Sequence, residues 1–536
     1  MPKLRFLFFA AVGLGGLLYT FYPTIFSGFD RMQSDPGDVV LNNYFLEHTY
    51  RWAFDREYPH SFWSPGFFTP ARDTFTYSET LVGTAPIYWL FRIGFSESVA
   101  CQLWILLTFV LNYVSLVVVL RWFKVTPILT AAGAYFFAFG VIRTDHLPHQ
   151  QLMPQYFSPF AIWYAWMMLK DPSIRRWITF LGLCVIQILA SLHLGWFLGF
   201  SLLIFVACGF FVEAGSFRRV REFVQGKPIA TMLPLLIAAV LLGMYARNFY
   251  RGTPGSRSYW EAAAYTPYPD GWFVSPPGNI WGDHFTPRDV EQFPEKMLFP
   301  GFAAYGIFLV GGLYAWRKKA IAQRTLTLAC LGTSALLTML VTRWGYDLSL
   351  WFFVHQLVPG ANAFRAVGRI VFVIYLFGTI GGLLGVQELL RANVACSTRR
   401  GMIYALVGLC LIAEQIRLNP ESFDKREMLY GPARELVPYL KGADAAHIIN
   451  DGSMPDYRHQ ITAMWAGLWA KTPVTNGFSG TWPKDYVSML DDATVGHLVK
   501  DLGPGWQGKL VVVEWASPIR RRVYLVRDGQ ATLVSE

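Results

Sequence analysis

The chain has 536 residues, of which 53% are hydrophobic, 17% aromatic and only 15% charged. Soluble domains carry a charge on about a quarter of their residues, so this composition argues against an ordinary soluble protein and indicates a membrane protein. The formal net charge is +10. The surplus Lys and Arg lie mostly between apolar segments, as in membrane proteins, so no nucleic-acid partner is expected.

The N-terminal segment has two interpretations. Its sequence, MPKLRFLFFAAVGLGGLLYTFYPTIF, has the basic start and apolar centre of a secretory signal peptide. No small-residue cleavage site follows it, and many further apolar segments do. We therefore expect an uncleaved first membrane helix.

Eleven segments are apolar and long enough to cross a bilayer core of roughly 30 Å. A shorter apolar stretch at 81–95 is a further candidate for a span, but Pro86 and its length favour a helix lying at the membrane interface. The predicted spans are 5–26, 97–120, 127–142, 152–169, 177–193, 195–213, 229–246, 298–316, 325–342, 370–390 and 402–417.

The basic residues between these spans set the expected orientation. If the N-terminus lies in the cytoplasm, the basic connections all fall on the cytoplasmic side, where membrane proteins carry an excess of Lys and Arg. We therefore expect a multi-pass protein of the inner (cytoplasmic) membrane, surrounded by membrane lipids. The connections are RWFK, KDPSIRR, SFRRVREFVQGK, RKKAIAQR and LLRANVACSTRR.

The longer connections then face outward. They are 27–96, 247–297 and 343–369, and the second of these is rich in aromatic residues that suit either a sugar site or an interfacial belt. In the tail after the last span, KLVVVEW and RRVYLV have the composition of β-strands. We predict an all-α polytopic membrane domain over 1–417 and a small α/β periplasmic domain over 418–536.

Two carboxylates, Asp35 and Asp38, follow the first span in the turn SDPGDVV. One interpretation is that an acid caps a helix beginning near Val39. The other is catalytic, because a carboxylate partly desolvated at the membrane face gains basicity and suits a general base. Both interpretations stay open at this point.

Further polar residues lie near the ends of spans. Glu79 in TYSETLVG begins the interfacial stretch, where a charge is costly unless it is paired or functional. In RTDHLPHQQ, His146 and His149 would make two metal ligands if they were helical, but Pro148 disfavours a helix and no third ligand is evident. We therefore assign no metal-ligating residues, and we expect these histidines and Gln150 to bind an anion or a substrate hydroxyl. The six cysteines form no CxxC motif and predict neither disulfides nor a zinc site.

Two arginines break the orientation pattern. Arg365 and Arg369 in NAFRAVGR lie on the outward side, four residues apart. Guanidinium groups at a lipid interface bind phosphate or diphosphate bidentately. The alternative is that they only extend to lipid headgroups.

These features together resemble the GT-C superfamily of integral membrane glycosyltransferases. The resemblance rests on a cytoplasmic N-terminus, a long first outer loop that opens with acids, short basic inner loops and an outer C-terminal domain. The strings DPGD, YSETLVG, HLPHQQL, FRAVGRI and NGFSG are similar to those of bacterial multi-span proteins assigned to that superfamily. Lipid A aminoarabinose transferases and protein O-mannosyltransferases are more distantly similar. The likeness covers the membrane half, and the tail mainly at Asn476 to Gly480.

The resemblance implies transfer of a sugar from a polyprenyl-phosphate donor to a glycan, lipid or protein hydroxyl, with inversion. By position, Asp35 or Asp38 matches the catalytic acid of the family, although a Pro-Gly pair separates the two acids here, whereas relatives often carry adjacent ones. We favour Asp38, because the nearby helix start would keep it ionised. A divalent cation such as Mg²⁺ or Mn²⁺ stays open, and no other cofactor is implied.

Roles for the remaining polar residues follow from their chemistry. Arg365 and Arg369 would neutralise the leaving phosphate, where charge develops. The other four would orient donor or acceptor: Glu79, His146, His149 and Gln150.

Two other functional classes stay open. A lipid-linked sugar transporter would also have many spans, but it would carry ionisable residues within them and internal repeats, whereas Glu414 is the clearest charge in these spans. A non-enzymatic envelope-assembly protein would tolerate the loss of Asp35 and Asp38.

Overall fold

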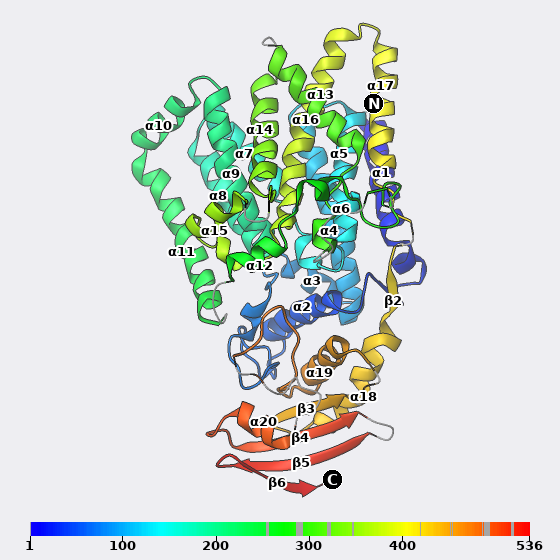
Figure 1. Cartoon of the computed structure of the whole chain (residues 1–536), viewed down its shortest axis with the longest axis vertical. Coiled ribbons are helices and arrows are strands. Elements are labelled where there is room, and N and C mark those ends of the chain that lie inside the picture. Colours follow the sequence, from blue (N-terminus) through cyan, green and yellow to red (C-terminus); the bar gives the residue numbers. More distant parts are fainter. Residues whose placement is uncertain are drawn as a thin grey trace.

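The computed structural model of the chain is mostly helical, with a small sheet near the C-terminus (Figure 1). Both features agree with the prediction. Parts of the predicted loops 247–297 and 343–369 and of the connection RKKAIAQR lie outside the described residues. The structure describes residues 2–252, 257–282, 284–285, 293–318, 323–345, 348–418, 420–450, 452, 454–484, 486, 494–515 and 519–535.

Each predicted span is helical over most of its length. The helix bounds follow the caps and prolines of the sequence, since Pro127, Pro159 and Pro228 each lie in a first helical turn, where proline is tolerated. The helices are α1 (Pro2–Phe26), α4 (Glu97–Trp122), α5 (Pro127–Phe139), α7 (Ser158–Lys170), α8 (Ile174–Ala190), α9 (Leu192–Val212), α11 (Pro228–Gly252), α13 (Phe302–Arg317), α14 (Arg324–Leu340), α16 (Val371–Asn393) and α17 (Ser397–Ala413).

Among the described residues, six helical segments are long and apolar enough to cross a membrane. This is the pattern of a helical membrane protein, and the number of eleven crossings stays a prediction. The six segments are Lys3–Phe26, Glu97–Trp122, Pro127–Asp145, Leu192–Val212, Pro228–Gly252 and Val367–Asn393.

The helices formed by the predicted apolar segments 152–169 and 81–95 are much shorter than a membrane span requires. Helix α7 has 13 residues, about 20 Å, because the chain through Pro154 stays irregular until Ser158. The stretch 81–95 contains α3 (Ala85–Arg92), whose eight residues measure about 12 Å. A bilayer core is roughly 30 Å thick, so the eight residues of α3 are too short to cross it by themselves, which favours the interfacial interpretation.

Helix α16 forms the centre of the bundle and α11 its most exposed edge. In the most apolar stretch of α16 every residue is buried, whereas in that of α11 only 6% of the residues are. Ile229 of α11, for example, is 79% exposed. Glycines let α16 approach α13 closely: a Cβ at Gly385 would lie 2.4 Å from the carbonyl oxygen of Gly311. Small residues at helix contacts are typical of membrane bundles.

The basic and the long connections lie at opposite ends of the molecule. Figure 1 shows the N-terminus, α10 (Ser216–Gly226) and the turn between α16 and α17 at one end, and the C-terminal sheet at the other. Helix α2 (Asp38–Phe54) lies between the bundle and the C-terminal region (Figure 1). The grouping expected from charge is therefore also a grouping in space, and its assignment to cytoplasm and periplasm stays a prediction.

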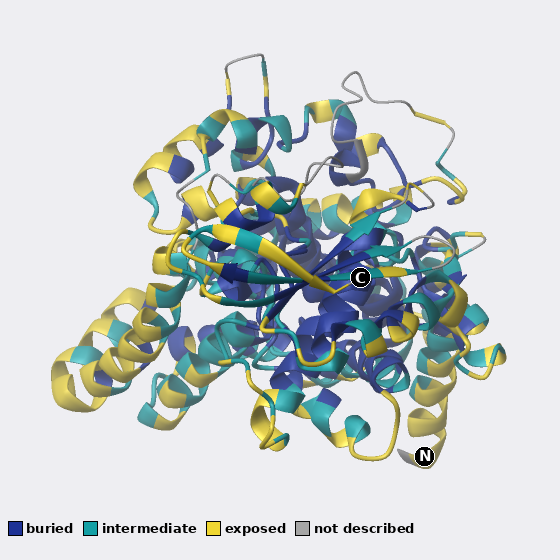
Figure 2. Cartoon of the chain, turned by 90° about the horizontal axis from the view of Figure 1, so that it is seen from below, coloured by how far each residue is buried: buried dark blue, intermediate teal, exposed yellow. Residues whose placement is uncertain are grey.

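The C-terminal region is an α/β unit with strand order β3-β4-β5-β6. Strand β3 (Ala445–Asn450) runs parallel to β4 (Gly508–Trp515), and β5 (Arg520–Arg527) and β6 (Gln530–Ser535) follow antiparallel. The predicted strands KLVVVEW and RRVYLV are confirmed as β4 and β5. Figure 2 shows the change from buried to exposed residues across this sheet, with β6 mostly exposed. Helices α18 (Gly431–Leu440), α19 (Asp456–Ala470) and α20 (Val495–Leu502) complete the unit.

This tail packs on the loop that follows the first predicted span. Strand β1 (Arg31–Gln33) pairs antiparallel with β2 (Ser422–Asp424), and the indole of Trp465 in α19 donates a hydrogen bond of 3.3 Å to the carbonyl of Val40 in α2. Buried residues of α2 and α19 belong to one apolar core. The tail therefore forms one wall around the residues that follow the first span.

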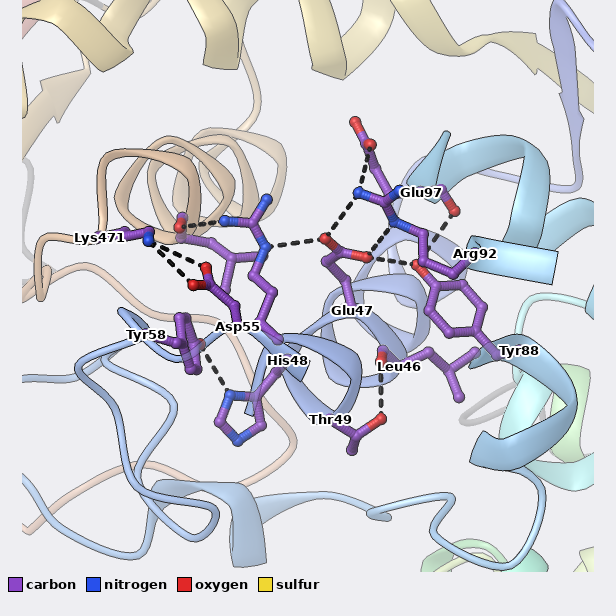
Figure 3. Close-up of polar contacts among 12 residues, drawn as sticks. Leu46, Glu47, His48, Thr49, Asp55, Tyr58, Tyr88, Arg92, Glu97 and Lys471 are labelled. Carbon is purple, nitrogen blue, oxygen red and sulfur yellow. Dashed lines mark hydrogen bonds and ion pairs between the residues drawn. The ribbon is translucent and has the colours of Figure 1, made fainter. Parts of the chain in front are cut away.

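A buried ion-pair network holds α2 in place (Figure 3). The carboxylate of Glu47 is fully buried and accepts hydrogen bonds of 2.8 Å each from Nε of Arg51, Nε of Arg92 and the hydroxyl of Tyr88. Arg51 also donates to the carbonyl of Leu468 in α19, at 3.2 Å. A buried carboxylate needs such partners. The network fixes the orientation of α2 relative to α3 and α19.

Glu414, the charge expected within the last span, lies just beyond the end of α17. Its carboxylate accepts a hydrogen bond of 2.7 Å from the backbone N–H of Ala303, in the first turn of α13. Helix N-termini carry free N–H groups and favour an anion there. This acid therefore caps a neighbouring helix.

Candidate functional site

Side chains from four separate segments meet at the end of the bundle that faces α2 and the tail. Asp38 begins α2, and His146 and His149 follow the short helix α6 (Val141–Asp145). Glu295 lies in the 3₁₀ turn Phe293–Lys296, and Arg369 in the 3₁₀ turn Val367–Ile370. We refer to these five residues as the central cluster.

The central cluster is a continuous set of charged contacts. Oδ2 of Asp38 lies 2.7 Å from Nδ1 of His149, and Nε2 of His149 lies 3.4 Å from Oε1 of Glu295. Nε2 of His146 lies 3.4 Å from the other oxygen of Glu295. The guanidinium of Arg369 holds both oxygens of Glu295, with Nε 3.1 Å from each. Glu295 is thus the common partner of two histidines and an arginine.

The local backbone explains how both histidines face Glu295. His146 ends α6, and its Nδ1 lies 2.9 Å from the carbonyl oxygen of Ile142, so Nε2 points away from that helix. Pro148 then turns the chain, and the N–H of His149 bonds to the carbonyl of His146 at 3.0 Å. The two rings, 6.4 Å apart between centroids, are therefore placed by a turn and not by a helix face.

The charges of the central cluster are mutually stabilising. Burial alone would raise the pKa of Asp38, but the hydrogen bond with His149 and the nearby arginine charges outweigh it, so the pKa is lowered. Burial and the charge of Arg369 would lower the pKa of His149, but its contacts with Asp38 and Glu295 raise it overall. Burial opposes ionisation of Glu295 too, yet Arg369 and the two histidines hold its pKa well below the ordinary value.

Asp35 has a different environment from Asp38. Its Oδ1 accepts a hydrogen bond of 2.7 Å from the N–H of Gly37, and burial raises its pKa, with a smaller raising effect from the Asp38 charge. A Cβ at Gly37 would lie 2.8 Å from that Oδ1, so a larger residue at this position would displace the Asp35 carboxylate. The helix-capping interpretation is excluded, because α2 begins at Asp38 after Gly37 with no side-chain cap. The pKa of Asp38 is therefore lower, and that of Asp35 higher, than the ordinary value for an aspartate.

We expect the Asp38–His149 contact to stabilise the protein only within a pH window. Because folding lowers the pKa of Asp38, its ionised carboxylate stabilises the folded protein fully above about pH 3.8, the ordinary pKa of aspartate. This stabilisation is lost as the pH falls through the folded-state pKa. The raised pKa of His149 makes its contribution complete below about 6.5 and lost as the pH rises through the folded-state value. The Tm difference between wild type and His149→Gln should be largest between these limits. Thermal unfolding across pH measures it, and a difference that is constant with pH would contradict the contact.

The structure gives Arg365 and Arg369 different partners. The Arg369 side chain is 11% exposed and bound to Glu295, whereas that of Arg365 is 41% exposed, with Nη1 3.9 Å from Glu261. Arg365 also lies over the ring of Tyr265, 5.4 Å from its centroid. We expected the two arginines to bind one phosphate together because they are four residues apart. Arg365 instead precedes the 3₁₀ turn that contains Arg369, so the two side chains do not share one helix face. Of the two, Arg365 is the one open to an anionic ligand.

Glu79 and Gln150 lie outside the central cluster. The Glu79 carboxylate, 4% exposed, accepts hydrogen bonds from the N–H groups of Leu192 and His193 at 2.8 and 3.3 Å, and also contacts Nδ1 of His193. Gln150 is fully buried, with Oε1 3.8 Å from Sγ of Cys101. Within the described part of the chain, neither side chain bonds to the central cluster. Glu79 instead caps α9.

We expect Glu79→Ala to destabilise the protein by about 1–3 kcal/mol, because two partly buried N–H groups at the start of α9 lose their acceptor. Thermal unfolding measures the change. Glu57→Ala is the matched control, since the Glu57 side chain is 88% exposed and pairs with Lys471 at the surface, and it should change stability by less than about 1 kcal/mol. Equal effects of the two substitutions would argue against the capping role.

Sequence reasoning missed Glu295. The signal was present, since Glu295 lies just before the predicted span 298–316, where an unpaired charge is as costly as at Glu79. The described residues contain no group of three or more His, Cys, Asp or Glu side chains arranged to hold a metal ion. In the central cluster the guanidinium of Arg369 binds both oxygens of Glu295, so a metal cation would have to displace Arg369 to bind this carboxylate.

Comparison with protein-family models and with curated protein sequences finds no match for this chain. Its function is therefore inferred from the chemistry of the site.

Proposed function

We propose that this protein is a membrane glycosyltransferase. It moves a sugar from a polyprenyl-phosphate donor to a hydroxyl acceptor at the outer face of the cytoplasmic membrane, with inversion at the anomeric carbon. The observation that carries the proposal is the pair of unlike carboxyls, Asp35 and Asp38, in one turn beside buried histidine and arginine side chains. Such a pair supplies one group for proton transfer and one fixed negative charge. The apolar helices give a lipid-linked donor access from the bilayer.

Asp35 is the better candidate for the base. A general base works best when its pKa approaches the operating pH, and burial raises the pKa of Asp35 while that of Asp38 is lowered. Oδ2 of Asp38 also bonds to His149, whereas among the described residues Asp35 bonds only through Oδ1, to the N–H of Gly37. The preference for Asp38 that came from the helix start is therefore replaced in this proposal.

The proposed reaction balances as a single displacement. The acceptor O–H gives its proton to Asp35, and its oxygen attacks the anomeric carbon from the face opposite the phosphate. The bond between that carbon and the phosphate oxygen breaks, and polyprenyl phosphate leaves with the electron pair. Arg365, exposed and cationic, is the group that would meet the phosphate. The charge of Glu295 is balanced by Arg369, and that of Asp38 by His149.

The test uses the full-length protein in nanodiscs with a panel of undecaprenyl-phosphate-linked hexoses and pentoses. We expect release of undecaprenyl phosphate from at least one donor, and loss of release in Asp35→Asn and in Arg365→Ala. Glu57→Gln, on the exposed surface, is the control that should retain release. Donor binding without release by the wild type would overturn the proposal and favour a non-enzymatic envelope-assembly protein. Movement of intact donor between leaflets would favour a transporter.

A further inference from the structure

The tail contributes an aromatic side chain to the turn that holds Asp35. Tyr457 is in the first turn of α19, and its ring approaches Gly37: a Cβ at Gly37 would lie 3.7 Å from Cε2 of Tyr457 and 2.8 Å from Oδ1 of Asp35. One point in the turn is thus flanked by the Asp35 carboxylate and the Tyr457 ring. These residues are more than four hundred positions apart in the chain.

Tyr457 is open to a ligand, unlike the residues that follow it in α19. It is 39% exposed, whereas the helix is buried from His459 to Leu468. Its ring lies 6.2 Å from that of Phe478, in the NGFSG segment. Among the described residues its hydroxyl has no hydrogen-bond partner. The Tyr457 side chain is therefore partly accessible to a ligand at the edge of this turn.

The NGFSG segment links Tyr457 to the arginine side of the site. Beyond Phe478, a Cβ at Gly480 would lie 3.9 Å from Nη2 of Arg365, and the carbonyl of Gly480 accepts a hydrogen bond of 3.1 Å from Arg257. The tail therefore borders both Asp35 and Arg365. An acceptor that enters along the tail meets the Tyr457 ring next to the proposed base.

We propose that Tyr457 is the platform of an acceptor subsite for a carbohydrate, whose sugar ring stacks on the tyrosine while one hydroxyl faces Asp35. The inference rests on the proposed glycosyl transfer and names its acceptor class. A sugar ring presents an apolar C–H face and polar edges, which match an aromatic ring beside a carboxylate. A lipid acceptor would instead need an apolar path to Asp35, whereas the partly exposed side chain beside this turn is a tyrosine with a polar hydroxyl.

Sugar binding can be measured without any donor. Saturation-transfer NMR on the full-length protein in nanodiscs, with methyl glycosides of glucose, galactose, mannose and arabinose, should show binding of at least one. Tyr457→Ala should weaken it about tenfold, the loss expected for one aromatic stacking contact. Tyr457→Phe should stay near the wild type. Tyr250→Ala removes a tyrosine that is 90% exposed on α11 and should have no effect.

The inference would be overturned if no glycoside binds the wild type, or if Tyr457→Ala binds as well as the wild type. With an active donor, Tyr457→Ala should raise the KM for the glycoside and leave the rate of donor hydrolysis by water unchanged. An equal loss of the transfer rate and the hydrolysis rate would also contradict the inference. Tyr457-dependent sugar binding without cleavage of any donor would refute the proposed transfer and leave the sugar site standing.

Discussion

Replacing Asp35 by Asn should lower the rate of sugar transfer about 10²–10⁴-fold, the range supplied by a general base. The amide cannot take the acceptor proton, and it changes the size of the side chain little. In the wild type the rate should rise with pH through the pKa of Asp35, which burial raises above its ordinary value near 3.8. Asp35→Asn should remove this acid limb. Transfer rates measured between pH 4 and 8 test both points.

Asp38→Asn distinguishes the two acids. Because the Asp38 charge contributes to the raised pKa of Asp35, its removal should shift the acid limb to lower pH without abolishing it. The pKa of His149 should fall as well, because Asp38 is one of the partners that raise it. If Asp38→Asn abolishes the acid limb and Asp35→Asn retains it, Asp38 is the base and our assignment is wrong.

Replacing Glu295 by Gln should destabilise the protein by about 3–5 kcal/mol, the cost of leaving one charge of a buried ion pair without its partner. The Arg369 and Glu295 side chains are only 11% and 10% exposed, so water compensates little of the loss. Both histidines lose a charged partner as well. Thermal unfolding in nanodiscs should show a large fall in Tm.

Glu261→Gln is the matched control for this substitution. Glu261 also lies between two arginines, Arg257 and Arg365, but its side chain is 34% exposed. Surface ion pairs contribute about 0–1 kcal/mol, so its Tm should stay close to that of the wild type. Replacing Glu295 and Arg369 together by Met removes both buried charges and should recover part of the lost stability. A Glu295→Gln variant as stable as Glu261→Gln would show that the buried pair has no such role.

The helical membrane architecture could be read from the sequence because its signals are local. An apolar run such as 97–120 specifies its own helix, since every backbone hydrogen bond forms within the segment. The β-strand composition of β4 and β5 is local in the same way. The limits of this reasoning appear at 152–169, where composition predicts a span but Pro154 delays the helix to Ser158.

Part of the site could be predicted for a similar reason. A charge or histidine at the end of an apolar segment needs a partner or a function, and this rule selected Asp38, His149 and Arg369, which the structure brings together. The same rule selected Glu79, but it cannot tell a substrate ligand from a helix cap. That distinction depends on α9, whose first residues lie more than a hundred positions away.

The sequence by itself determined which residues are costly to bury, and only the tertiary structure decided which partners compensate them. Asp38 meets His149 across 111 residues, and Arg369 meets Glu295 across 74. Side-chain patterns extend over a few residues of one helix or strand, so they carry no information on such distant contacts. The fold therefore gives Arg365 and Arg369 different partners, and it places Tyr457 of the tail beside the turn that holds Asp35.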